Sequence, residues 1–329
     1  MPRSSYLPLV ALALLPCAIA SSGDRAQVFQ VCLKFCATNY CSHSPRLDLP
    51  LRLAWWTYLD DCKYRCMHEI TNATEQKRQR GDQRAHVEQY YGKWPFWRLL
   101  GMQEPASVLF SLLNLCAHVK GGRYQQKKLS AGHPMRAYYR AWTLLGINSW
   151  ICSALFHTRD TPLTEKLDYF SAAASIMFAL YGAGVRLFHA YDFPTRWQLW
   201  TATCLTAYIT HVTYMAIAPR FDYTWNIIFN VALGTLHNLF WLAFSVKYIH
   251  FRWLLERPTT FLLNYYWKPG ALAIFTTFAT CFELFDFPPW RRIIDAHSLW
   301  HLVTAPITIL WYRFLTEDGL DAGWKRREE

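Results

Sequence analysis

The stretch AHSLWHLVTAPITILWYRFL, residues 296–315, decides the fold class of this protein. It is long and apolar enough to cross a bilayer, which takes about 20 mostly apolar residues. Near its start, His297 and His301 are four residues apart and therefore share one face of a helix. Ionisable side chains within a span are costly and mark candidate functional sites. The stretch therefore predicts a membrane-spanning helix with a polar site at one end.

Six stretches upstream have similar length and apolar character. They predict spans at 98–118, 137–157, 166–187, 197–218, 222–246 and 269–287. The first is interrupted by Gln103 and Glu104, and the sixth ends near Glu283 and Asp286, where these carboxylates would meet water. The predicted fold is therefore all-α, a polytopic membrane protein with seven transmembrane helices in a domain of residues 98–315.

The flanking segments predict a secretory route. Residues 1–20 have the features of a cleaved signal peptide: Arg3, a short apolar core, and the small-residue site Ala18-Ile19-Ala20. The apolar core is too short to span a bilayer. We expect residues 21–97 to form a lumenal, cysteine-rich head and linker, and residues 316–329 to form a cytosolic tail.

The net charge of +11 is explained by topology rather than by a nucleic-acid partner, because no basic stripe carries a nucleic-acid motif. With a lumenal N-terminus, basic residues concentrate in the segments 119–136, 188–196, 247–268 and the tail, which are then cytosolic. The short lumenal loops hold only Arg159, Arg220, Arg291 and Arg292. Arg291 and Arg292 are exceptions to the rule that basic residues concentrate in the cytosolic segments.

The head contains two cysteine pairs with the spacing of one helical turn, Cys32 with Cys36 and Cys62 with Cys66. On two antiparallel helices, Cys32 would pair with Cys66 and Cys36 with Cys62, which leaves Cys41 over. A zinc site is the alternative, but an oxidising lumen favours disulfides. Asn72-Ala73-Thr74 is a glycosylation sequon in the same segment.

Five polar residues converge at the predicted lumenal edge. Ser153 and His157 share a face at the end of the second span, Asp168 begins the third, and His297 and His301 open the seventh. Three imidazoles with a free fourth position are typical of catalytic zinc. We assign zinc to the three histidines, a water-orienting and proton-accepting role to Asp168, and an oxyanion-stabilising role to Ser153.

Other interpretations of the same residues stay open at this point. Ser153 could be the nucleophile with His157 as its base, although no G-x-S-x-G elbow surrounds it. The two histidines of the last span could form an interfacial pair without a ligand. Ser153 alone is typical of a small polar residue at a helix contact.

The motifs resemble a known family. Ser-x3-His, an Asp eleven residues later and His-x3-His in the last span resemble the membrane hydrolases that include alkaline ceramidases and adiponectin receptors. Within that superfamily, the full-length pattern resembles the Per1-like family, through Asn148-Ser149-Trp150, Phe156-His157-Thr158-Arg159-Asp160 and Asp295 to His301. The resemblance implies a zinc-dependent phospholipase A2 of the Golgi membrane. Its substrates would be GPI-anchored proteins, and it would remove the unsaturated sn-2 acyl chain from their anchors. Its other partners would be the membrane lipids around it.

The role of two arginines and the identity of the substrate both have alternatives at this point. Arg291 and Arg292 could hold the lipid phosphate at the mouth of the site, or could simply snorkel to the interface. Two rival functions fit the same five residues: a ceramide amidase, and a non-catalytic seven-span receptor or escort with structural zinc.

Overall fold

The computed structural model describes residues 21–43, 47–255 and 266–321, and of residues 40–43 and 248–255 only the backbone. The predicted signal peptide, the Cys41 side chain and most of the predicted tail lie outside this description. The described residues are mostly helical and contain no strand, only isolated bridges. The all-α prediction is confirmed.

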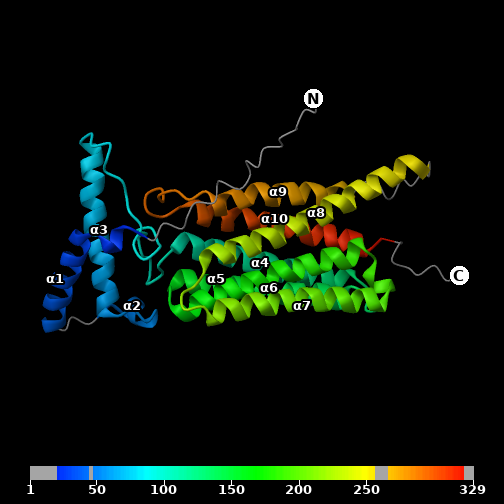
Figure 1. Cartoon of the computed structure of the whole chain (residues 1–329), viewed down its shortest axis with the longest axis horizontal. Helices are drawn as coiled ribbons and strands as arrows, with labels where there is room; N and C mark the ends of the chain where they lie inside the picture. The colour runs from blue at the N-terminus through cyan, green and yellow to red at the C-terminus, as the bar shows by residue number, and fades with distance from the viewer. Residues whose placement is uncertain (1–20, 44–46, 256–265, 322–329) are drawn as a thin grey trace, which may run out of the picture.

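Two parts can be distinguished in Figure 1. A small head contains α1 (Gln27–His43), α2 (Leu49–Leu53) and α3 (Tyr58–Gln79) at one end of the molecule. The rest is a bundle of long helices that run along its long axis: α4 (Pro105–Lys128), α5 (Arg136–Thr158), α6 (Pro162–Leu187), α7 (Pro194–Ile217), α8 (Tyr223–Leu255), α9 (Trp267–Leu284) and α10 (Ala296–Gly319).

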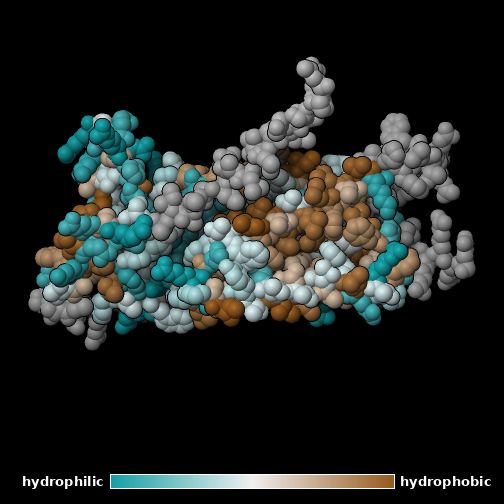
Figure 2. Space-filling view, in the orientation of Figure 1, coloured by the Kyte–Doolittle hydropathy of each residue, from teal (hydrophilic) through white to brown (hydrophobic). Residues whose placement is uncertain are grey.

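The bundle is a closed ring. α4 packs on α5, α5 on α6, α6 on α8, α8 on α9, α9 on α10, and α10 returns to α4, while α7 packs against α6. Its core includes Tyr139, Phe244 and Phe314, each at most 1% exposed. Figure 2 shows hydrophobic residues gathered over the bundle and hydrophilic residues over the head.

The seven predicted stretches match these helices, with one displaced start. The first begins at Pro105 instead of 98, because Leu99 to Met102 forms a tight turn with Leu100 and Gly101 at positive φ. Pro105 then occupies the first turn of α4, where its missing N–H costs nothing. At the other end of the bundle, three helices continue beyond the predicted boundaries at residues 118, 246 and 315: α4 to Lys128, α8 to Leu255 and α10 to Gly319. The first parts of three segments predicted to be cytosolic are therefore helical.

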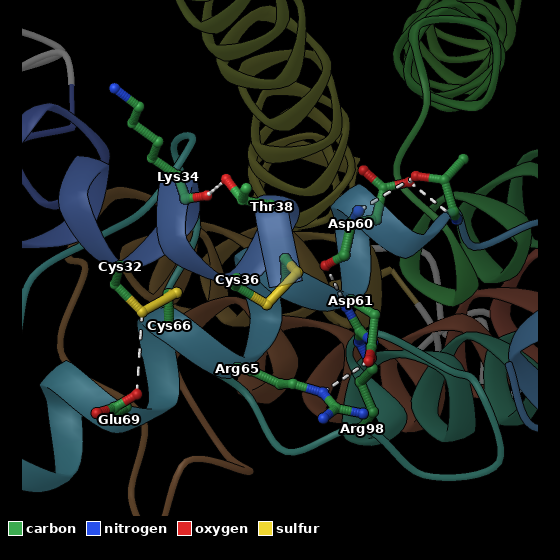
Figure 3. The surroundings of a disulfide bond; sticks show 12 residues. Cys32, Lys34, Cys36, Thr38, Asp60, Asp61, Arg65, Cys66, Glu69 and Arg98 are labelled. Atoms are coloured by element: carbon green, nitrogen blue, oxygen red, sulfur yellow. Dashed lines mark hydrogen bonds and ion pairs between the residues drawn. A yellow bond between two sulfur atoms is a disulfide. The ribbon is translucent and has the colours of Figure 1, made fainter. Parts of the chain in front are cut away.

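The head is built on the predicted disulfides. Cys32–Cys66 and Cys36–Cys62 join α1 to α3 with Cα–Cα separations of 5.8 and 5.7 Å, which confirms the antiparallel pairing (Figure 3). Phe29 and Tyr90 pack beside them. Asn72 is exposed on α3, and its glycosylation stays a prediction.

Ion pairs join the head to the bundle and to the linker that precedes it. Arg292, 4% exposed, donates to both carboxylate oxygens of Glu75 on α3 and to Nδ1 of His68. Arg159, just after α5, pairs with Asp60 at 2.7 Å. Arg98 pairs with Asp61 and lies between the rings of Trp56 and Tyr64, and Figure 3 shows this ion pair.

His68 is at the centre of this contact. Its Nε2–H donates to the Phe96 carbonyl at 3.0 Å, its Nδ1 accepts from Arg292 at 2.9 Å, and its ring stacks on Trp97. Burial, together with the Arg292 and Arg98 cations, lowers the pKa of His68 from 6.5 to about 4. The ring is therefore neutral in the folded head.

Replacing Arg292 should loosen the docked head. Arg292→Ala leaves Glu75 and the buried His68 without their partner, which we expect to cost about 2 kcal/mol of unfolding free energy. Thermal unfolding of the purified protein in detergent measures the change. Arg291→Ala is the matched control, because Arg291 is exposed. Equal stability of the two variants would contradict the docking role.

Acid should also destabilise the head. An unfolded His68 binds a proton near pH 6.5, whereas the folded one binds it only near pH 4. The unfolded state therefore binds more protons in this window, and the free energy of unfolding falls as pH drops through it, by up to about 3 kcal/mol. Limited proteolysis of the head at pH 7 and pH 4.5 measures this loss. His68→Gln should flatten the dependence, and an unchanged slope would refute the assignment.

Candidate metal centre

The end of α5 positions His157. The last carbonyls of a helix lack partners within it, and here the segment that leads into α4 supplies them. Glu104 N–H donates to the His157 carbonyl and Gln103 N–H to the Thr158 carbonyl, both at 3.0 Å. His157 is 2% exposed, so its ring is held inside the bundle end nearest the head.

The start of α10 positions the other two histidines. Asp295 caps the helix: its carboxylate accepts from Ser298 N–H at 2.8 Å, and Ser298 Oγ accepts from Asp295 N–H. A capping box of this kind fixes where a helix begins. His297 and His301 follow one turn apart, and Asn114 of α4 donates to the His301 carbonyl at 2.7 Å.

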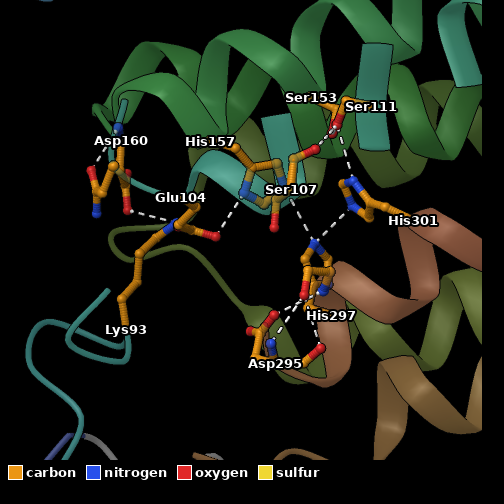
Figure 4. Close-up of polar contacts among 12 residues, drawn as sticks. Lys93, Glu104, Ser107, Ser111, Ser153, His157, Asp160, Asp295, His297 and His301 are labelled. Carbon is orange, nitrogen blue, oxygen red and sulfur yellow. Dashed lines mark hydrogen bonds and ion pairs between the residues drawn. The ribbon is translucent and has the colours of Figure 1, made fainter. Parts of the chain in front are cut away.

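The three imidazoles meet at their Nε2 atoms, as Figure 4 shows. Nε2 of His297 lies 3.3 Å from Nε2 of His157 and 3.0 Å from Nε2 of His301. One nitrogen from each ring lies within 4.8 Å of the others. Tetrahedral zinc, with Zn–N bonds of about 2.0–2.1 Å, places its nitrogens roughly 3.3 Å apart.

Each ring is also held by a hydrogen bond at its other nitrogen, Nδ1. Nδ1 of His157 lies 2.8 Å from a Glu104 oxygen, and Nδ1 of His297 lies 2.7 Å from a Glu283 oxygen. An ionised carboxylate only accepts hydrogen bonds. Each carboxylate therefore accepts from Nδ1–H, which leaves Nε2 of each ring directed at the centre.

Ser111 fixes the third ring in the same way. Its hydroxyl donates to the Ser107 carbonyl at 2.7 Å, so its oxygen is left to accept. It accepts from Nδ1–H of His301 at 3.0 Å and from the hydroxyl of Ser153 at 3.1 Å. The Nε2 lone pair of His301 therefore also faces the centre.

Three Nε2 atoms that converge on one point can share a cation between them. The protonated second nitrogens and their oxygen partners are the arrangement found around metal-bound histidines. The residues therefore fit a divalent metal ion of the kind that imidazole binds, a class that includes zinc. His297 is the open side of the centre, with 37% of its side chain exposed.

The structure brings together most of the predicted site. His157, His297 and His301 form the cluster, and Ser153 joins it through Ser111. Asp168, half-buried on α6, lies close enough to His157 and His297 for their charges to interact. The catalytic roles of Ser153 and Asp168 stay predictions. A role of His157 as base for Ser153 gains no support, because both ring nitrogens of His157 are engaged elsewhere.

Arg291 and Arg292 have different surroundings. Arg292 is committed to Glu75 and His68, which explains a cation in this loop without a substrate. Arg291 is exposed and lies over the Trp290 ring at 5.0 Å. Phosphate binding by either stays a prediction.

The sequence analysis missed the residues that hold the rings: Glu104, Glu283, Ser111 and Lys93. Lys93 pairs with Glu104 and, at 3.5 Å, with Asp160. Glu104 and Glu283 did give a signal, as carboxylates inside predicted spans. Ser111 gave none, because a lone serine in an apolar helix is common.

Comparisons with known proteins give the family. The Per1-like family matches residues 48–319. The chain is 35% identical to the GPI-specific phospholipase A2-like PGAP3 of Xenopus tropicalis, over 95% of each chain. It is 36% identical to the Schizosaccharomyces pombe Protein PER1 homolog, covering 94% of this chain and 91% of that one. It is 35% identical to post-GPI attachment to proteins factor 3 of Drosophila melanogaster, covering 94% and 92%.

The match spans most of the chain at an identity that establishes common descent, so the chain belongs to the Per1-like family. No solved structure is similar enough to compare.

The orienting carboxylates should matter for metal affinity. Glu283→Gln keeps the size of the side chain but weakens its hold on His297, and we expect metal affinity to fall about 10–100-fold. Competition with a chelator, followed by elemental mass spectrometry, measures this. Glu317→Gln, an exposed carboxylate at the far end of the bundle paired with Lys268, is the matched control. Equal metal retention by both variants would rule out the centre described here.

Proposed function

We propose that this member of the Per1-like family is a zinc-dependent phospholipase A2 that removes the sn-2 unsaturated acyl chain from the GPI anchor of GPI-anchored proteins. The names of its relatives, GPI-specific phospholipase A2-like protein and post-GPI attachment to proteins factor 3, support the substrate. The observation that carries the proposal is the convergence of three oriented imidazoles at the head end of the bundle.

The surface of the bundle supports a membrane location for all seven long helices. Two of them, Pro162–Leu187 and Tyr223–Lys247, are long and apolar enough to cross a membrane by composition alone. The others do not meet this criterion of length and composition, yet every helix exposes large apolar side chains. Examples, one from each helix in order, are Leu112, Leu144, Leu167, Leu205, Leu239, Phe278 and Leu310. Soluble proteins rarely expose so continuous an apolar surface.

The head end would face the lumen of the secretory pathway. Disulfides persist in oxidising compartments, and two of them hold the head together. The metal centre lies at the same end, because Arg159 and Arg292 join the head to the segments that carry His157 and His297. GPI anchors face the lumen too, which suits the Golgi membrane as the place of action.

Each part of the hydrolysis can be assigned to a particular group of the site. A zinc ion held by the three histidines would supply a Lewis acid and lower the pKa of a bound water to about 7. Asp168, near His157 and His297, would accept the proton of the attacking water and pass it to the leaving alkoxide. Ser153 would donate to the oxygen of the ester carbonyl as negative charge develops on it, after its hydroxyl turns away from Ser111.

The depth of the centre suits an acyl ester, which lies just below the lipid headgroups. His301 is one helical turn deeper than His297, and His297 provides the open side. A substrate that stays in the membrane could therefore present its ester to the metal while its headgroup projects toward the head of the protein.

Loss of the metal ligand or of the base should block remodelling of GPI anchors. In cells that lack the endogenous activity, wild type should convert unsaturated sn-2 chains to the remodelled form, measured by mass spectrometry of the anchors. His301→Ala should abolish conversion, and Asp168→Asn should lower it at least about 100-fold.

Metal content separates the possible explanations. Asp168→Asn should keep its zinc while losing activity, which a structural role for zinc does not predict. Full activity of Asp168→Asn together with Ser153→Ala would favour a receptor or escort. Unremodelled anchors with active hydrolysis of ceramide would favour the amidase.

A further inference from the structure

A cavity of about 530 Å³ lies between the head and the bundle, beside the metal centre. One wall comes from the head and its linker, with Trp56, Tyr91 and Trp94. The other comes from the first turns of α6 and α8, with Glu165 and Tyr223. Cavities at the interface of two parts of a protein are common ligand sites.

The cavity adjoins the metal centre at two points. Lys93 lines it and pairs with Glu104, which holds Nδ1 of His157, and Figure 4 shows this chain of contacts. Glu165 also lines it and is three residues before Asp168, so both lie on one face of α6. A molecule with one end in the cavity could therefore have its other end at the three histidines.

The lining has an unusual composition for a lipid pocket. It contains aromatic rings and charged groups of both signs, including Lys63, Lys93, Asp160 and Glu165. Tyr91 is exposed, and the Lys63 ammonium lies over its ring at 5.2 Å. Tyr223, also exposed, donates its hydroxyl proton to Glu165.

Such a lining suits a sugar. The apolar face of a sugar ring packs on an aromatic face, and its hydroxyls donate to carboxylates and accept from ammonium groups. An acyl chain would gain nothing from these charges and would lose their solvation. The Lys63 ammonium, whose side chain is 33% exposed, also suits a phosphate.

We propose that this cavity binds the glycan and phosphate of the lipid headgroup, so that the disulfide-linked head determines substrate specificity. The inference rests on the proposed function, because a GPI lipid carries a glycan and a phosphate directly above the ester. The head thereby does more than cap the bundle: it recognises the part of the substrate that distinguishes a GPI from an ordinary phospholipid.

The test compares two substrates of the purified full-length protein in the same detergent: a GPI glycolipid, and phosphatidylinositol with identical acyl chains. Wild type should prefer the glycolipid. Tyr91→Ala and Tyr223→Ala, one from each wall, should each lower kcat/KM for the glycolipid about threefold to tenfold, the effect of one lost aromatic contact. Hydrolysis of phosphatidylinositol, which carries the phosphate but no glycan, should fall much less, and thermal unfolding of each variant in the same detergent checks that it is folded.

Tyr58→Ala is the matched control, an exposed tyrosine of the head outside the cavity. It should leave both substrates unaffected. A glycolipid preference that survives in the Tyr91→Ala and Tyr223→Ala double variant would overturn the inference and leave the proposed function standing. An equal loss on both lipids would overturn it too, since the cavity would then serve the fold.

A binding measurement separates the two proposals. The water-soluble glycosyl-inositol-phosphate, without acyl chains, should bind Asp168→Asn protein in saturation-transfer NMR and should not bind the same protein with both tyrosines replaced. Binding without hydrolysis of either lipid by wild type would refute the proposed function alone. No binding, or binding that the tyrosine changes leave intact, would refute the cavity assignment.

Discussion

The arrangement of the three imidazoles constrains the rest of the structure. Nε2 of His297 lies 3.0 Å from that of His301 and 3.3 Å from that of His157, a spacing that suits one shared metal ion. Holding each ring there requires an oxygen behind it, and these oxygens come from the segment before α4, from α4 and from α9. Four long helices must therefore meet at one end of the ring, and the order of packing from α9 through α10 and α4 to α5 achieves this.

The head is coupled to the same end. Arg292 is three residues before the cap of α10, and Arg159 is two residues after His157, yet both form ion pairs with α3. Lys93 in the linker pairs with one carboxylate oxygen of Glu104, and the other oxygen contacts Nδ1 of His157. The disulfides and the ion pairs thus stabilise the loops that carry the metal ligands, and a head that loosens would release them. This coupling explains why a small disulfide-linked head accompanies the histidine cluster.

Much of this could be predicted from the sequence, because the signals are local. Apolar length gave the seven long helices, one-turn cysteine spacing gave both disulfides, and the histidine spacing gave the metal cluster. The misses depend on contacts between distant segments. Nothing local distinguishes Glu283, which orients His297, from a carboxylate that meets water, nor Arg292 with its partner Glu75 from an arginine that binds phosphate. The start of α4 was misplaced because a tight turn can be as apolar as a helix.

The central claim is that metal-dependent ester hydrolysis takes place at the three histidines. The most direct measurement uses the purified protein with a GPI lipid labelled in its sn-2 chain, and follows release of the labelled fatty acid alongside zinc content. The account predicts about one zinc per chain, loss of release on chelation, recovery on adding zinc, and neither zinc nor release in His157→Ala. Release that persists in metal-free protein, or in His157→Ala, would contradict it.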